Sequence, residues 1–338
     1  TSMRLSGTYA VFGNDKATDF VLASAKVNED EPEEEKEEKT DYGENVSDLD
    51  FAALSEAETN ETLKAMHTYV NSLTPSKKNE YTGLFKGKNL ILICAEAFSD
   101  AVIHEELTPT LYRLTHSGFY FSDFYQPTWG GSTSTGEYSF LTGLVPMDGI
   151  DTMQKNRDNL NYYTMGTQLM NQGYFSRAYH NGTYKFYDRH LTHQNLGYEQ
   201  YIAQDNGLED IAGASWIGDT VMFDKTMDTY IGQQPFSIYY MTVSGHCIYK
   251  EDDVKTDENL ERVKAVLGDQ YKDTTIYYYC YQMELEKALT LMIEKLTAAG
   301  IADDTVICMT SDHYPFGNIE NIWKYGRLCG GSVRTSDS

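Results

Sequence analysis

Short runs of apolar residues recur along the chain and are separated by longer stretches with helical periodicity. Continuous apolar runs of this length are typical of strands that are buried on both faces of a sheet. Their alternation with helices favours an α/β fold with a largely parallel central sheet flanked by helices. The predicted strands are residues 90–95, 175–179, 236–243 and 305–310.

Helices are predicted where apolar residues repeat every three or four positions. One such stretch predicts a helix over residues 55–73, with a proline beyond it as a stop signal. The proline at position 109 predicts a helix start there, because proline is tolerated in the first helical turn. Longer helices are predicted over residues 219–230 and 271–299, the latter ended by Gly300.

Composition divides the chain into unequal parts. It has 338 residues, 41% of them hydrophobic, which suffices for one large core or a core with a small lobe. Residues 29–58 hold 14 acidic residues against two lysines, half of the net charge of -24. We therefore expect an acidic, disordered spacer over residues 1–54, then a helical lead-in over residues 55–87. A catalytic domain over residues 88–317 and an atypical tail over residues 318–338 complete the predicted organisation.

Charge and cysteine usage exclude some classes of function. An acidic chain without a basic face repels polyanions, so we expect no nucleic-acid partner. No run reaches the roughly 18 consecutive apolar residues of a membrane span. The five cysteines show no CxxC spacing and are interpreted as small buried hydrophobes.

Metal-ligand residue types follow two of the predicted strands. Glu96 comes directly after the first strand, and Asp312 and His313 come just after the last. Ligands in open α/β sheets gather beyond the carboxyl ends of the strands, so these side chains are expected to meet. Two carboxylates and one imidazole suit Mn²⁺ or Mg²⁺, with Zn²⁺ a weaker candidate.

A hydroxyl-rich turn supplies a candidate nucleophile. Thr133 lies in a Gly-Ser-Thr-Ser-Thr-Gly-Glu segment that precedes a helical stretch. A cation acidifies a bound hydroxyl, and a helix start favours an anionic group, so together they suit phosphoryl transfer. Each motif alone is more often a turn or a solvated edge, and only their combination in one α/β chain favours catalysis.

The ordered motifs resemble those of a known family. They are Cys-Ala-Glu96-Ala-Phe-Ser, Thr108-Pro-Thr-Leu, Gly-Ser-Thr133-Ser-Thr-Gly-Glu137, Thr-Val-Ser-Gly-His246 and Ser-Asp312-His313. From about residue 88 to 316 the chain resembles the extracellular catalytic domain of lipoteichoic acid synthases, sulfatase-like members of the alkaline phosphatase superfamily. The resemblance implies that Glu96, Thr133, Asp312 and His313 bind one Mn²⁺ or Mg²⁺. It also implies that Thr133 attacks phosphatidylglycerol to form a glycerophosphoryl-threonine.

The resemblance assigns further residues and a setting. His180 and Arg189 match positions that contact the glycerophosphate, and His246 is expected to act as general acid or base. A glycolipid or polyglycerophosphate would be the acceptor. An upstream anchor would hold the domain on the outer face of a bacterial membrane.

The chain also departs from the family. Ser132 replaces a lysine and Tyr187 a tryptophan, which leaves the substrate less defined than the reaction type. The family continues with further strands past Asp-His, so the C-terminal end is expected to be incomplete or unusual. A phosphoethanolamine transferase, another phosphodiesterase of the superfamily, or a non-catalytic cell-surface binding module remain as alternatives. A sulfatase fits less well because the Cys/Ser-x-Pro-x-Arg motif is missing.

Overall fold

The computed structural model describes residues 40–46, 49–121, 124, 133–209, 218–251, 256–317 and 332–334. The chain divides into two compact units, and the boundary lies between residues 86 and 87. Residues 1–39, which hold much of the predicted acidic spacer, lie outside the described residues. Within the described part, no helix combines the length and the apolar character needed to cross a membrane.

The smaller unit contains two short helices, α2 (Phe51–Ala57) and α3 (Glu61–Ser72). Asp50 caps α2, because its side chain accepts a hydrogen bond from the Ala53 amide. Asn60 caps α3 by accepting from the Leu63 amide. The helix predicted over residues 55–73 is therefore divided into two, and α2 begins at Phe51, within the segment predicted to be a disordered spacer up to residue 54. Two side-chain caps ten residues apart start separate helices, a signal that the acidic composition masked.

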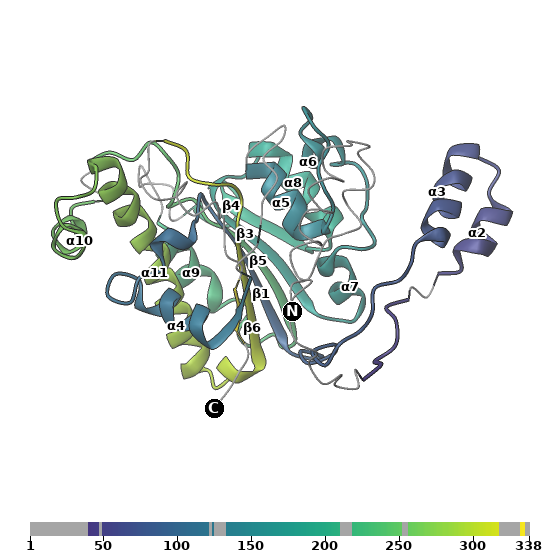
Figure 1. The fold of residues 1–338 in the computed structure, drawn as a ribbon, viewed down its shortest axis with the longest axis horizontal. Coiled ribbons are helices and arrows are strands. Elements are labelled where there is room, and N and C mark those ends of the chain that lie inside the picture. Colours follow the sequence, from purple (N-terminus) through teal and green to yellow (C-terminus); the bar gives the residue numbers. More distant parts are fainter. Residues whose placement is uncertain are drawn as a thin grey trace, which may run out of the picture. The chain divides into compact units, whose positions relative to one another are not determined.

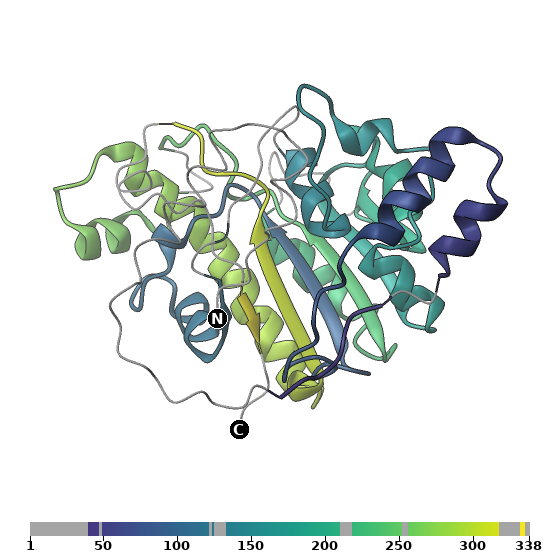
Figure 2. The same ribbon diagram turned by 45° about the vertical axis from the view of Figure 1, so that its right-hand side comes forward.

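The larger unit is built on one seven-stranded sheet with the order β2-β7-β6-β1-β5-β3-β4. The five strands from β6 to β4 are parallel, whereas β7 is antiparallel to both of its neighbours. Figure 2 shows β1 and β6 side by side along their length. The strands are β1 (Asn89–Ala95), β2 (Gly118–Tyr120), β3 (Phe175–Thr183), β4 (Gln200–Gln204), β5 (Phe236–Met241), β6 (Thr305–Ser311) and β7 (Ser332–Arg334).

These strands confirm the predicted α/β fold with a largely parallel sheet. All four predicted strands are present, and β4, which the sequence analysis missed, extends the parallel part of the sheet. Residues 332–334 were placed in a separate tail, but their backbone forms β7 within the sheet.

Helices cover both faces of the sheet. Figure 1 shows α4, α9 and α11 on one side of the strands and α5, α6, α7 and α8 on the other. The α-helices of this unit are α4 (Pro109–Ser117), α5 (Thr133–Thr142), α6 (Thr152–Lys155), α7 (Met165–Asn171), α8 (Arg189–Thr192), α9 (Asp219–Met227), α10 (Leu260–Leu267) and α11 (Asp273–Ala298). Short 3₁₀ helices are η2 (Asp100–Val102), η3 (Phe186–Asp188), η4 (Gln194–Leu196) and η6 (Ala302–Asp304). The predicted helices near residues 109, 219 and 271 are confirmed.

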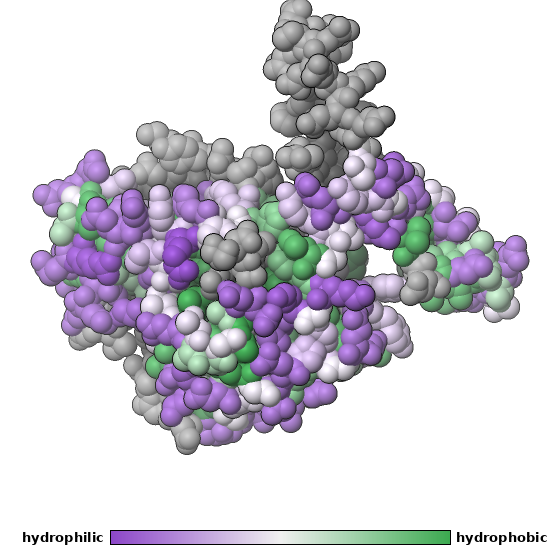
Figure 3. Space-filling model, turned by 90° about the horizontal axis from the view of Figure 1, so that it is seen from below, coloured by the Kyte–Doolittle hydropathy of each residue, from purple (hydrophilic) through white to green (hydrophobic). Residues whose placement is uncertain are grey.

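The central strand β1 contributes to two hydrophobic cores. Ile91 and Ile93 pack into the core on the α9 and α11 side, whereas Leu92 and Cys94 pack into the core beside α5. Successive side chains of a strand point to opposite faces, so burial on both faces requires a continuous apolar run. Figure 3 shows that hydrophilic residues cover most of the visible surface outside the grey atoms. The apolar sequence of β1 thus reflects its place at the centre of the sheet.

Candidate metal centre and nucleophile

Three predicted metal ligands meet at the carboxyl ends of β1 and β6. Ala95 pairs with Ser311 in the parallel register, which places Glu96 next to Asp312. One ligand atom from each of Glu96, Asp312 and His313 lies within 4.8 Å of the other two. All three side chains are buried, with at most 4% of their surface exposed. The sheet register therefore assembles residues that are separated by more than 200 positions in the chain.

Hydrogen bonds orient this trio toward a common point. Asp312 Oδ1 accepts from the amides of Ala97 and His313, both at 2.8 Å. His313 Nδ1 donates to the carbonyl of Tyr314 at 2.7 Å, which leaves Nε2 unprotonated in the neutral ring. Nε2 lies 3.4 Å from Glu96 Oε1 and 3.2 Å from Asp312 Oδ2. Within the part of the chain that the structure describes, neither of those oxygens has a hydrogen-bond partner.

Two buried carboxylate oxygens without partners require a compensating charge. Burial and the neighbouring Asp312 raise the pKa of Glu96 well above its ordinary value. A divalent cation between the carboxylates and the imidazole would supply that charge, so the residues fit a metal of this type.

Removing a carboxylate from this trio is expected to weaken cation binding strongly. Glu96→Ala and Asp312→Ala should each lower the affinity for Mn²⁺ by at least about 100-fold, because a ligand matters at least as much as the groups that orient it. Calorimetric titration measures this change. Glu105→Ala removes an exposed carboxylate and is the matched control. Unchanged affinity in both ligand variants would rule out this site.

The candidate nucleophile starts a helix beside the trio. Thr133 is the first residue of α5 and is buried. Three positions later, a Cβ atom on Gly136 would lie 1.9 Å from the carbonyl oxygen of Asp312. Only glycine permits this approach, which brings the first turn of α5 against the metal-ligand segment. The next hydroxyl, Ser134 Oγ, is already engaged because it donates to Asp151 Oδ2 at 2.8 Å.

His180 lies at the end of β3 and is buried. Its Nδ1 donates to the carbonyl of Met241 at 2.9 Å. Burial, followed by the nearby Arg189 charge, lowers the pKa of His180 to about 3. A neutral ring protonated on Nδ1 offers Nε2 as an acceptor, and the predicted contact of His180 with the glycerophosphate stays a prediction.

Arg189 is paired with a carboxylate that the sequence analysis did not single out. Its Nε and Nη2 donate to Glu137 Oε2 at 2.9 and 2.7 Å, and both side chains are buried. Tyr239 OH donates to Glu137 Oε1 at 2.8 Å. Burial alone would raise the pKa of Glu137, but Arg189 and His193 hold it well below its usual range. Glu137 thus occupies Nε and one hydrogen of Nη2, and the predicted contact of Arg189 with the glycerophosphate stays a prediction.

Asp219 joins the ends of β3 and β5 beneath these residues. Its Oδ1 accepts from Asn181 Nδ2 at 2.8 Å and from the Val243 amide at 3.0 Å. Further along, a Cβ atom on Gly245 would lie 2.1 Å from the Glu96 carbonyl oxygen. The segment after β5 is thereby held against Glu96. His246 in that segment is exposed, so its predicted role as general acid or base stays a prediction.

Stability should depend on pH through Asp219. Burial raises the pKa of Asp219 from 3.8 to about 6, so folding favours the protonated form. Stability is therefore lost as pH rises from about 4 to 6, by about 3 kcal/mol for two pKa units. Relative to the parent, Asp219→Asn should gain stability across that window and level off above it. Chemical denaturation at several pH values checks this, and a difference independent of pH would contradict it.

Left-handed backbone conformations flank the site. Ala97 follows Glu96 with φ 49°, and Tyr187 and Asp188 precede Arg189 with φ 54° and 55°. Residues other than glycine adopt this region at a cost of about 1–3 kcal/mol each. In the described part of the chain, only Asp205 shares this property away from these positions. The strain is concentrated where the chain turns the site residues inward.

The fold is an α/β sheet whose parallel strands end at a cluster of two carboxylates and an imidazole, and it is similar to the folds of the solved structures described below. The chain belongs to the sulfatase family, because the family model described as Sulfatase matches residues 88–326.

Proteins similar to this chain include lipoteichoic acid synthases and a phosphoglycerol transferase. Lipoteichoic acid synthase 1 of Bacillus subtilis is 27% identical over 265 residues, which cover 74% of this chain and 40% of that protein. The lipoteichoic acid synthase LtaP of Listeria monocytogenes has a similar fold, with a TM-score of 0.65, 22% identity and coverage of 80% and 71%. The Streptococcus pyogenes phosphoglycerol transferase GacH, solved with sn-glycerol-1-phosphate, has a TM-score of 0.56, 15% identity and coverage of 84% and 74%. The chain thus spans less than half of the Bacillus relative.

Two buried carboxylates were missed by the sequence analysis. Glu137 lies four residues after Thr133, a spacing that places both on one face of a helix. A glutamate on the inward face of a helix start was the available signal. Asp219 sits at the start of α9, where an aspartate is ordinary, so the sequence offered no comparable signal.

Proposed function

We propose that this domain is a metal-dependent phosphoglycerol transferase that takes glycerophosphate from phosphatidylglycerol. The observation that carries the proposal is the pair of buried oxygens of Glu96 and Asp312 beside His313, which accept no hydrogen bond from any described residue. The similarity to lipoteichoic acid synthases, and the glycerol phosphate bound by the Streptococcus protein, support this donor class.

Glu96, Asp312 and His313, together with the Thr133 hydroxyl, would hold the cation. Mostly oxygen ligands favour Mn²⁺ or Mg²⁺ over Zn²⁺. Once bound, the cation would lower the pKa of a coordinated hydroxyl and offset phosphate charge. The positive end of the α5 dipole would favour an anionic group at the same place.

The transfer would occur in two steps. Thr133 Oγ, having lost its proton to solvent, forms a bond to phosphorus while the bond to the diacylglycerol oxygen breaks. Protonated His246 gives its proton to that departing oxygen. In the second step an acceptor hydroxyl loses its proton to His246 and attacks phosphorus, and Thr133 Oγ is released.

Two further side chains would position the glycerophosphate group. Neutral His180 would accept a hydrogen bond at Nε2 from a glycerol hydroxyl, because its Nδ1 is occupied by Met241. Arg189 would direct Nη1 toward a phosphate oxygen while Glu137 fixes its plane.

The natural setting would be the outer face of a bacterial membrane. An N-terminal region would provide the anchor, and the acceptor would be a glycolipid or a polyglycerophosphate chain. Such a reaction would contribute to lipoteichoic acid or a related cell-surface polymer.

A covalent adduct on Thr133 is the expected result of incubation with phosphatidylglycerol and Mn²⁺. Without an acceptor the second step stalls, so mass analysis should find a glycerophosphoryl group on the peptide that contains Thr133. Phosphatidylethanolamine is the matched donor control and should give little adduct. Head-group release without any adduct would instead favour direct attack by water, and no release from metal-loaded protein would favour a binding module.

A further inference from the structure

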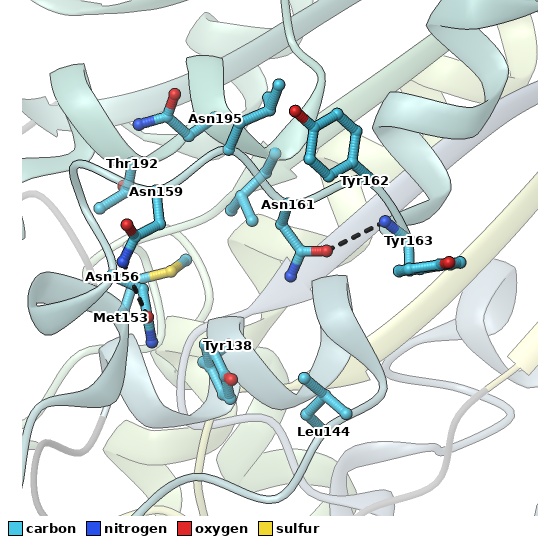
Figure 4. Close-up of a pocket in the computed structure, with 12 residues that line it drawn as sticks. Tyr138, Leu144, Met153, Asn156, Asn159, Asn161, Tyr162, Tyr163, Thr192 and Asn195 are labelled. Carbon is cyan, nitrogen blue, oxygen red and sulfur yellow. Dashed lines mark hydrogen bonds between the residues drawn. The ribbon is translucent and has the colours of Figure 1, made fainter. Parts of the chain in front are cut away.

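A cavity of about 320 Å³ opens beside α5, and none of its lining residues is a candidate metal ligand (Figure 4). This volume is at the lower end of the range of roughly 300–1,000 Å³ that is common for small-molecule sites. Its lining contains four asparagines and three tyrosines, and none of its twelve lining residues carries a charge. A cavity without cations does not attract a phosphate, so its chemistry suits a neutral ligand with hydroxyl groups.

Backbone hydrogen bonds fix two of the asparagines and leave one end of each amide available. Asn161 Oδ1 accepts from the Tyr163 amide at 3.0 Å, and Figure 4 shows its carboxamide in the space above Tyr138. Asn195 Nδ2 donates to the carbonyl of Arg157 at 2.5 Å. Among the described residues, Asn161 Nδ2 and Asn195 Oδ1 have no hydrogen-bond partner. A donor and an acceptor held in place match hydroxyl groups, which both accept and donate.

Exposed aromatic rings accompany these amides. Tyr162 is 66% exposed and Tyr163 57% exposed, and Leu144 and Leu160 beside them are also exposed. Sugar rings present C–H faces between their hydroxyl groups. Tyrosine rings can cover such faces while neighbouring amides bind the hydroxyls, so the lining combines both parts of carbohydrate recognition.

The cavity shares its two walls with the candidate site. Tyr138 comes five residues after Thr133 on α5, about 8 Å along the helix axis. Thr192, another lining residue, lies at the end of α8, the helix that begins with Arg189. The ion pair between Glu137 and Arg189 connects the two helices. A ligand in the cavity would therefore lie close to the place of transfer.

We infer that this cavity binds the neutral carbohydrate head group of the acceptor. The inference rests on the proposed transfer and deepens it. A cavity with an uncharged lining favours a neutral sugar over the charged end of a polyglycerophosphate chain. The domain would then attach the first glycerophosphate unit to a glycolipid, with a sugar hydroxyl as the attacking group.

Binding of the full chain to maltose, a neutral disaccharide, tests the inference without catalysis. We expect saturable binding by ligand-observed NMR, with sn-glycerol-1-phosphate failing to displace maltose. Asn159→Leu and Tyr162→Ala alter exposed lining residues and should each weaken maltose binding about tenfold or more. Asn171→Leu, an exposed asparagine outside the cavity, should bind maltose like the parent.

Three outcomes would overturn the inference: no maltose binding, binding that is insensitive to both cavity variants, or displacement of maltose by glycerol phosphate. The outcome of the maltose experiment can be distinguished from the outcome of the adduct experiment. An adduct on Thr133 together with no maltose binding would reject only the acceptor site. Maltose binding that depends on the cavity, together with no adduct and no head-group release, would reject the transferase and the acceptor role, and would leave the cavity as a carbohydrate-binding site.

Discussion

Replacing Thr133 with alanine is expected to reduce diacylglycerol release from phosphatidylglycerol by at least about 10³-fold, because the attacking oxygen is lost. Ser134→Ala should retain most of the activity. The two hydroxyls are adjacent in sequence but differ in their surroundings, since Ser134 Oγ donates to Asp151 while Thr133 starts the helix next to Asp312. A fluorescent phosphatidylglycerol assay separates the two variants.

The Thr133 prediction requires that the variant still folds and binds metal. Thermal unfolding and Mn²⁺ titration of both alanine variants provide that control. Of the two variants, Ser134→Ala is expected to lose more stability, because it leaves Asp151 without its hydroxyl donor. If Thr133→Ala retained most of the activity while Ser134→Ala abolished it, the assignment of the nucleophile would be wrong.

Glu137→Gln is expected to destabilise the larger unit by about 3–5 kcal/mol, because it leaves the buried Arg189 charge without its carboxylate. The same change should release the guanidinium from its fixed plane. Denaturant unfolding measures the first effect. The second should appear as a raised KM for phosphatidylglycerol with a smaller change in kcat, since Thr133 and the metal ligands are unaltered.

An exposed ion pair provides the matched control for Glu137→Gln. Glu258 pairs with Lys287 at the surface, where 76% and 34% of the two side chains are exposed. Glu258→Gln should therefore cost less than about 1 kcal/mol. A loss of that small size for Glu137→Gln would mean that Arg189 finds another partner and that the pair does not hold α5 and α8 together.

Much of the fold could be predicted because its signals are local. The apolar runs of β1, β3, β5 and β6 follow from burial on both faces, and the rule that ligands gather beyond parallel strand ends located Glu96, Asp312 and His313. The two-helix arrangement of residues 51–72 was missed, since helix caps at Asp50 and Asn60 are weak signals within an acidic stretch. Strand β4 was missed because it has only three consecutive apolar residues between two glutamines.

The sequence by itself determined the parallel sheet, the three candidate metal ligands and a helical stretch after Thr133. These features depend on residue type and on spacing within one segment. The tertiary structure alone decided which atoms of His180 and Arg189 face the site. His180 bonds to Met241, 61 residues away, and Arg189 bonds to Glu137, 52 residues away. A hydrogen bond between such distant segments depends on the packing of α5, β3 and β5. No local sequence pattern can therefore show which atom of a side chain forms that hydrogen bond.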